Sequence, residues 1–202
     1  MKFRVSMMNA TKLQCITAVA ALLLVALAFA GCSIRIHSPP ELGLIETPNS
    51  DELPIGPFIG ALAPNFRLET LEGDTLALSD LRGKPVFLNF FAVWCYYCRF
   101  ETPEMEKVYQ MMGDKVAIVS VDMGEPKKRV SAYREIMGLT FTMTLDESLE
   151  ITRAYQVPAY PSTYLIDRDG VIRSIRIGAF LSEEEILGTL ESLGFLTDIG
   201  LK

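Results

Sequence analysis

The apolar positions of this chain fall in short runs separated by stretches of mixed character. The run 86–92 (VFLNFFA) has no charged residue and several aromatic ones, which is typical of a strand buried on both faces. The stretch that follows, 99–112, carries apolar side chains near helical spacing and predicts a helix. A second buried strand is predicted over 116–121, and a surface helix over 127–137 with Gly138 as its C-terminal cap.

Shorter elements surround these four. They are strands at 66–68 and 75–78 that form a hairpin at a sheet edge, a helical turn at 79–82, a strand at 141–145, a short helix at 148–155, antiparallel strands at 163–166 and 171–177, and a last helix from a capping box at Ser182 to Gly194. Strands that alternate with helices and end in a hairpin and a helix predict an α/β fold, with a central mixed sheet covered by helices on both faces.

The first 32 residues have the pattern of an export signal. A basic segment, 1–12, precedes an apolar core, 16–30, and the small residues Ala30 and Gly31 precede Cys32. This arrangement resembles a bacterial lipobox, in which Cys32 is lipidated and becomes the mature N-terminus, although Phe29 stands where leucine is usual. A cleaved secretory signal and an uncleaved anchor stay open as alternatives, but the apolar core is shorter than the roughly 20 residues of a spanning helix.

The chain is therefore expected to have three parts. Residues 1–32 are a signal peptide with a lipobox. Residues 33–59 are rich in proline, serine and acidic side chains and are expected to form a flexible tether. Residues 60–202 are expected to form the folded domain.

The charge of the exported part is acidic. The chain has 25 acidic and 19 basic residues, and three of the basic ones lie before the apolar core, so the part from Cys32 onward has a net charge of −9. Such a surface repels phosphate backbones, so we expect no nucleic-acid partner. The single histidine, His37, falls in the tether, where a solvated side chain is expected.

Two of the four cysteines are candidates for chemistry. Cys15 lies in the signal and Cys32 in the lipobox, which leaves Cys95 and Cys98. Two cysteines three residues apart at the start of a helix can form and break a disulfide with little backbone movement. The helix N-terminus stabilises a thiolate, so Cys95 is the expected nucleophile and Cys98 the resolving thiol.

Other uses of this cysteine pair were compared with redox chemistry. A structural zinc site needs four ligands, and no second cysteine pair or nearby histidine exists. Covalent haem attachment needs histidine after the second cysteine, where Arg99 stands. A purely structural disulfide stays open, although so small a loop stabilises a fold little. The expected cofactor list is therefore empty apart from the redox-active Cys95–Cys98 disulfide, and no metal is expected.

Several motifs taken together resemble the thioredoxin superfamily, and within it the TlpA/ResA-like extracytoplasmic thiol–disulfide oxidoreductases. They are Ala63-Pro64-Asn65-Phe66, Leu78 to Lys84, Asn89 to Cys98, Glu101-Thr102-Pro103, Tyr160-Pro161-Ser162-Thr163 and the terminal hairpin, spread over about 60–194. The resemblance implies a thioredoxin-like fold with the N-terminal hairpin and with an extra αβ insertion at 127–145.

The resemblance also implies roles for individual residues. Pro161 matches a cis-proline that lies against the cysteine pair and leaves backbone free for an extended substrate, with Trp94 and Tyr160 beside it; an ordinary turn proline is the alternative. Glu101 matches an acidic residue that handles the proton of the resolving thiol, and a solvated helix glutamate is the alternative. Asn89 stands where ordinary thioredoxins have a buried aspartate, which leaves Glu101 as the candidate carboxylate.

The function expected from these features is a membrane-tethered, extracytoplasmic oxidoreductase that reduces disulfides of client proteins. The resemblance implies a place in cytochrome c maturation and a membrane electron donor, and we expect a monomer. A peroxiredoxin-like peroxidase is an alternative, but Ala92 stands where such an enzyme usually has threonine. A copper-delivery module is another, but it normally needs a histidine in the domain. The dipeptide Tyr96-Tyr97 departs from the family pattern and leaves the redox direction open.

Overall fold

The computed structural model describes residues 53–196. The expected signal peptide, Cys32 and most of the expected tether lie outside the described residues. Within 53–196, seven strands form one mixed sheet in the order β2-β1-β5-β4-β3-β6-β7. The strands are β1 (Arg67–Thr70), β2 (Thr75–Ala77), β3 (Val86–Phe91), β4 (Ala117–Asp122), β5 (Thr142–Leu145), β6 (Ser162–Ile166) and β7 (Ile172–Ile177).

The centre of the sheet is parallel and its flanks are antiparallel. β3 is parallel to β4, and β4 is parallel to β5. On one flank β6 and β7 add antiparallel strands beside β3, and on the other the β1–β2 hairpin adds to β5. This arrangement confirms the predicted mixed sheet and its edge hairpin.

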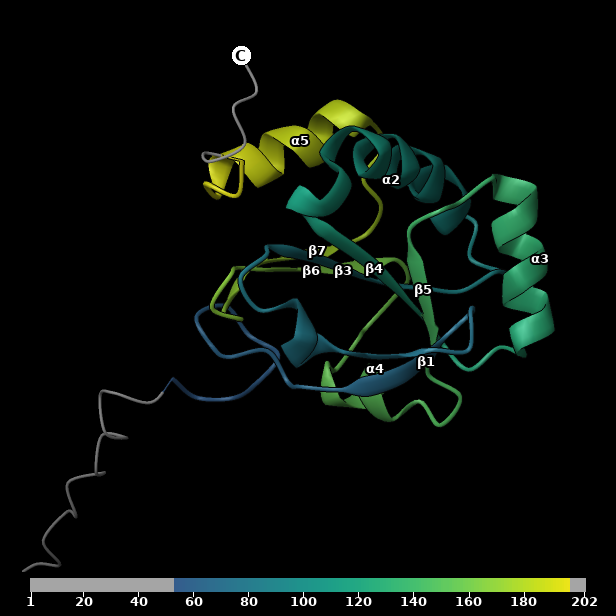
Figure 1. Cartoon of the computed structure of the whole chain (residues 1–202), viewed down its shortest axis with the longest axis horizontal. Coiled ribbons are helices and arrows are strands. Elements are labelled where there is room, and N and C mark those ends of the chain that lie inside the picture. The colour runs from purple at the N-terminus through teal and green to yellow at the C-terminus, as the bar shows by residue number, and fades with distance from the viewer. Residues whose placement is uncertain (1–52, 197–202) are drawn as a thin grey trace, which may run out of the picture. The chain divides into compact units, whose positions relative to one another are not determined.

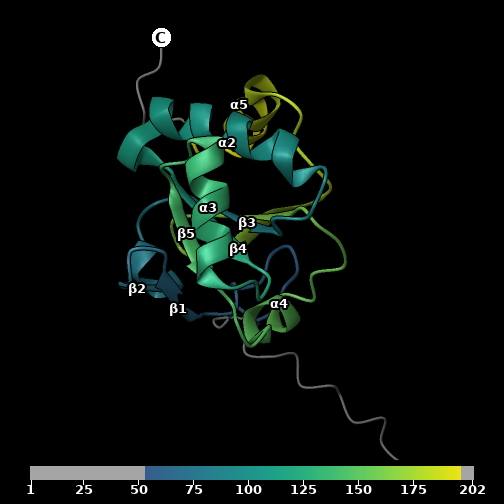
Figure 2. The same cartoon turned by 90° about the vertical axis from the view of Figure 1, so that its right-hand side faces the viewer.

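Helices cover both faces of the sheet unequally. The helices are α2 (Cys98–Met112), α3 (Lys127–Met137), α4 (Glu150–Ala154) and α5 (Glu183–Ser192), with short 3-10 turns η1 (Leu78–Leu81) and η2 (Gly113–Lys115). α5 packs against α2, and Figure 1 shows both above the sheet with α4 below it. Figure 2, a quarter turn away, shows α3 in front of the sheet.

The alternation of β3 side chains between two hydrophobic clusters explains why five of its six residues are apolar, Asn89 being the exception. Phe87 and Phe91 belong to a cluster with the buried sides of α2, α3 and α5. Leu88 and Phe90 belong to a second cluster on the other face, with Tyr155 after α4. Because successive strand residues point to opposite faces, a strand covered on both faces must be apolar at nearly every position.

The extra αβ insertion is present as α3 and β5, between β4 and α4. Its helix has the predicted bounds, because Pro126 precedes its first turn and Gly138 takes the left-handed conformation, with φ of 65°, that ends it. The last helix ends at Ser192, two residues before the predicted Gly194, and the Ser182 side chain accepts a hydrogen bond from the Glu185 N–H as its cap.

The described residues before residue 60, which the sequence assigned to the tether, are hydrogen-bonded to the domain. The Gly56 N–H donates to the Leu62 carbonyl, and the Leu62 N–H donates to the Pro54 carbonyl. The Gly60 N–H in turn donates to Ile172 in β7. The last part of the expected tether is thus hydrogen-bonded to the domain. Within residues 53–196, no helix has both the length and the apolar character needed to cross a membrane.

Candidate active site

A disulfide joins Cys95 and Cys98 at the end of the central strand. β3 ends at Phe91, a turn follows, and α2 starts at Cys98. The two Cα atoms are 5.3 Å apart. Cys98 is fully buried, whereas Cys95 has 4% of its surface exposed, so any partner that approaches from solvent meets Cys95 first.

The first backbone N–H of α2 faces the first cysteine. The Cys98 N–H donates to Cys95 Sγ at 3.1 Å. Tyr97, the residue before the helix, makes no side-chain cap, and the next two N–H groups of the first turn donate to the carbonyls of Tyr96 and Tyr97. Cys95 itself lies before the helix rather than in its first turn, so its sulfur is positioned in front of the helix N-terminus. That position favours the thiolate form of Cys95.

The peptide bond between Tyr160 and Pro161 is cis, as the resemblance implied. Pro161 directly precedes β6, and the pairing of Phe90 with Ser162 places it beside the end of β3 that leads to the disulfide. The Tyr160 ring meets the Trp94 ring edge-on, with ring centroids 6.2 Å apart. Trp94 is 59% exposed, so it forms part of the surface beside the disulfide and is not a core residue.

Glu101 is buried beside the disulfide, one helical turn after Cys98. Its Oε1 accepts the Phe180 N–H at 3.0 Å, and its Oε2 accepts Asn89 Nδ2 at 2.9 Å. Burial raises the pKa of Glu101 from 4.5 to about 7, although both hydrogen bonds act in the opposite direction. The alternative of a solvated helix glutamate is therefore wrong, because this side chain has no exposed surface.

Two further carboxyl groups lie near the cysteines and were missed in the sequence. Asp122 ends β4, and its Oδ2 accepts the Glu125 N–H at 2.7 Å. Glu125 in turn accepts the N–H of Val93, two residues before Cys95. Burial, together with the neighbouring Glu125, raises the pKa of Asp122 to about 7. The sequence could have indicated both residues. Parallel strands β3 and β4 end at the same edge of the sheet, so residues at or just after the ends of the two strands meet there.

Exposed aromatic side chains surround the disulfide. Tyr96 contacts both Tyr97 and Phe100 edge-on, with centroid separations of 5.4 Å and 4.9 Å. All three rings are at least half exposed. They lie on the turn and first helical turn that carry the two cysteines, so an approaching polypeptide meets aromatic surface there.

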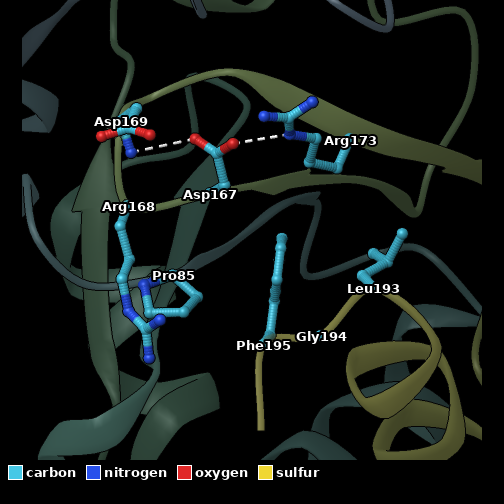
Figure 3. A pocket seen from close by; sticks show the side chains of 8 residues that line it. All are labelled: Pro85, Asp167, Arg168, Asp169, Arg173, Leu193, Gly194 and Phe195. Atoms are coloured by element: carbon cyan, nitrogen blue, oxygen red, sulfur yellow. Dashed lines mark hydrogen bonds and ion pairs between the residues drawn. The ribbon is translucent and has the colours of Figure 1, made fainter. Parts of the chain in front are cut away.

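A cavity of about 430 Å³ lies away from the disulfide, and neither cysteine lines it. It lies by Pro85, where β3 begins, and by the β6–β7 turn. Figure 3 shows Asp167 in this cavity between Asp169 and Arg173, and its carboxylate accepts hydrogen bonds from both. Since the disulfide lies at the opposite end of β3, we do not assign the redox chemistry to this cavity. Within the described residues, no three His, Cys, Asp or Glu side chains are placed to hold a metal ion.

The sheet order, the cysteine pair and the adjacent cis-proline define the class: the chain is a thiol–disulfide oxidoreductase with a thioredoxin-like fold. Comparison with known proteins agrees. The family model described as the AhpC/TSA family matches residues 59–175, and the chain therefore belongs to this family. It is 41% identical over 138 residues to the thiol-disulfide oxidoreductase ResA of Geobacillus thermodenitrificans, which covers 67% of this chain and 78% of that protein.

Solved structures are similar in the same way. One is a putative thiol:disulfide interchange protein DsbE from Chlorobium tepidum, 27% identical with a TM-score of 0.61, covering 66% of this chain and 94% of that one. Another is the exposed lipoprotein thioredoxin Etrx1 of Streptococcus pneumoniae, 29% identical with a TM-score of 0.54, covering 64% and 99% respectively. The residues matched by the family model, 59–175, include the cysteine pair, but the similarities do not by themselves assign a role to any neighbouring residue.

Proposed function

We propose that this protein reduces disulfides of client polypeptides outside the cytoplasm. The Cys95 thiolate attacks one sulfur of the client disulfide, that S–S bond breaks, and one client thiolate leaves. Cys98 then loses its proton and attacks Cys95 Sγ, which releases the second client thiolate and forms the Cys95–Cys98 disulfide. Two electrons pass to the client, and a dithiol electron donor must restore the reduced pair.

The unequal burial of the two sulfurs is the observation that carries this division of roles. Only Cys95 has exposed surface, and the Cys98 N–H is directed at its sulfur. Cys98 can therefore act only within the protein, on a mixed disulfide that Cys95 has already formed. Glu101, one helical turn beyond Cys98 with a pKa raised to about 7, is the group we assign to accept the Cys98 proton.

The client segment is proposed to lie along Pro161. A proline has no N–H to donate, and the residue precedes β6 at the edge where the disulfide lies. An extended client chain can pair there with free backbone, as in strand addition. Trp94 and Tyr160 form the adjoining surface, so they are assigned to contact the client rather than to react with it.

The surroundings of the disulfide favour reduction over oxidation of clients. Strong oxidants of this class stabilise their thiolate strongly, which lowers both the pKa and the stability of the disulfide. Here the nearby charged groups include three carboxyl groups, those of Glu101, Asp122 and Glu125, and within residues 53–196 no charged side chain donates to either sulfur. Instead, the nearby Arg99 side chain donates to the Val93 carbonyl.

We therefore expect a reduction potential nearer to that of thioredoxin, about −270 mV, than to that of DsbA, about −120 mV. Equilibration of the full-length protein with glutathione or dithiothreitol redox buffers, with the oxidised fraction measured by thiol alkylation, gives this number. A potential close to −120 mV would contradict the reducing direction and would identify the protein as an oxidant of thiols.

The anchor and the domain division are proposed from the sequence. Residues 1–32 serve as a signal with Cys32 as the lipidated residue, 33–59 connect the anchor to the domain, and 60–202 form the domain. The similarity to an exposed pneumococcal lipoprotein supports this arrangement. Mass spectrometry of the protein purified from membranes should show a lipid on an N-terminal Cys32; an intact N-terminus or a cleaved, unmodified one would contradict it.

The setting proposed for this activity rests on the resemblance to TlpA/ResA-like proteins. It comprises apocytochrome c as one client and a membrane protein as the electron donor, with the chain acting as a monomer. Trapping clients on the Cys98→Ser variant, discussed below, identifies them directly.

A further inference from the structure

A second surface beside the disulfide is a groove between the start of α2 and one face of α3. It is lined by Val93, Arg99, Arg129, Ala132, Tyr133, Ile136 and Met137, and has a volume of about 300 Å³. This is the lower end of the volumes of ligand pockets, and suits a few side chains better than a cofactor. We name these seven residues the α2–α3 groove.

The walls of the α2–α3 groove are apolar and held in place by the core. The Tyr133 ring stacks on Phe91, with centroids 5.8 Å apart, and its hydroxyl is 2.8 Å from Thr102 Oγ1. Ile136, by contrast, is 83% exposed. It lies one helical turn after Tyr133 on α3, so the groove presents a rigid floor with an exposed apolar side chain at its rim.

The charges at this groove are opposite to those of the chain as a whole. The chain has a net charge of −6, yet the two charged residues that line the groove are Arg99 and Arg129. Arg99 donates to the Val93 carbonyl, and Arg129 forms an ion pair of 3.5 Å with Glu125, so both guanidinium groups are held at the groove. A bound segment with an apolar side chain and a carboxylate complements both features.

The groove is also within range of the reacting sulfur. Val93 is two residues before Cys95, and two residues of extended chain span about 7 Å. A residue two or three positions from a client cysteine can therefore occupy the groove while that cysteine reaches Cys95.

We propose that the α2–α3 groove binds client polypeptides that carry an apolar residue next to an acidic residue within a few positions of the reactive cysteine. The inference rests on the proposed disulfide-reducing function and adds a selectivity to it. The apolar side chain enters the groove against Tyr133 and Ile136, and the carboxylate pairs with Arg99 and Arg129.

Three probe peptides test this selectivity. Each carries one cysteine as a mixed disulfide with 5-thio-2-nitrobenzoate, whose release is coloured, and each has two variable residues at the same distance from the cysteine: Leu-Glu, Leu-Lys or Ser-Glu. Reduced full-length protein should react with the Leu-Glu peptide about fivefold faster than with either other peptide at low ionic strength. The advantage over the Leu-Lys peptide should shrink as salt is added.

Variants test separately which residues cause the preference for a carboxylate and which cause the preference for an apolar side chain. Arg99→Gln with Arg129→Gln should remove the preference for Leu-Glu over Leu-Lys, and Ile136→Ser should remove the preference for Leu-Glu over Ser-Glu. Ile55→Ser, at another largely exposed isoleucine outside the groove, and Arg153→Gln, on α4, are the controls and should preserve both. A wild-type protein without these preferences, or variants that retain them, would overturn the proposal.

A small neutral disulfide separates this inference from the function on which it rests. Wild-type protein and Ile136→Ser should reduce 2-hydroxyethyl disulfide at equal rates. Failure of the wild type with this substrate would count against the proposed reduction itself, whereas normal reduction without peptide preference would reject only the groove. If Ile136→Ser converts a dimer to a monomer in sedimentation, the groove is an interface between two copies, and the client proposal is overturned.

Discussion

Replacing Cys95 with serine is expected to abolish disulfide reduction by this protein. A serine hydroxyl is not ionised near neutral pH and does not attack disulfides, and Cys98 cannot substitute for Cys95 because it has no exposed surface. Reduction of insulin by the full-length variant in the presence of dithiothreitol should fall to the rate of dithiothreitol alone. Turnover that persists in Cys95→Ser would contradict the assignment of Cys95 as nucleophile.

The matched variant, Cys98→Ser, should behave differently. It keeps Cys95, the more accessible of the two sulfurs, and the backbone N–H that faces it, so the first exchange still occurs. The mixed disulfide then persists because the resolving thiol is missing. Non-reducing gels should show client adducts with Cys98→Ser and none with Cys95→Ser, and adducts of equal yield in both variants would show that the roles are not divided as proposed.

Elements with a strong local pattern were predictable from the sequence. β3 is apolar except at Asn89 because both of its faces are covered, and α3 is marked by its amphipathic pattern between Pro126 and Gly138. The order of the strands in the sheet was less predictable from the sequence. The β1–β2 hairpin pairs with β5, a strand of the inserted segment some seventy residues away, and nothing in the local pattern of either strand specifies that neighbour.

At the site, the sequence could not predict which polar side chains are buried and which groups they contact. The sequence placed Glu101 on α2 but could not show that the Phe180 N–H, 79 residues later, covers one carboxylate oxygen. It treated Asn89 only as a missing proton carrier, whereas the structure shows that its amide donates to the Glu101 carboxylate. Both contacts join segments distant in sequence, so they depend on the completed fold.

Replacing Glu101 with glutamine is expected to slow the second exchange step and to change its pH dependence. With a pKa of about 7, Glu101 becomes able to accept the Cys98 proton as pH rises through neutrality. The rate of client release from the wild type should therefore rise with pH and level off above about pH 7. In Glu101→Gln this rise should disappear, and the rate at pH 7 should fall about 100-fold, the usual lower range for loss of a general base. Stopped-flow measurement of client release from a preformed mixed disulfide gives both quantities.

Glu104→Gln is the control for this substitution, since Glu104 lies on the same helix and pairs with the exposed Lys107. It should leave the rate and its pH profile unchanged. If Glu101→Gln also leaves them unchanged, Glu101 does not carry the proton and serves only to join α2 to Phe180 and Asn89.

The same variant should reveal the cost of burying Glu101 through the stability of the oxidised protein. The pKa of Glu101 is about 7 in the folded state and 4.5 ordinarily, so between these values the unfolded chain releases a proton that the folded protein retains. The free energy of unfolding therefore decreases as pH rises through this window, by about 3 kcal/mol in all, and stays lower above it.

Glutamine has no proton to release, so the stability of Glu101→Gln relative to wild type should increase between pH 4.5 and 7. Urea unfolding at pH 4.5 and pH 8 measures this difference, and the raised pKa of Asp122 cancels because it is present in both proteins. A difference that does not change with pH would mean that Glu101 titrates at its ordinary value and is already charged below neutral pH.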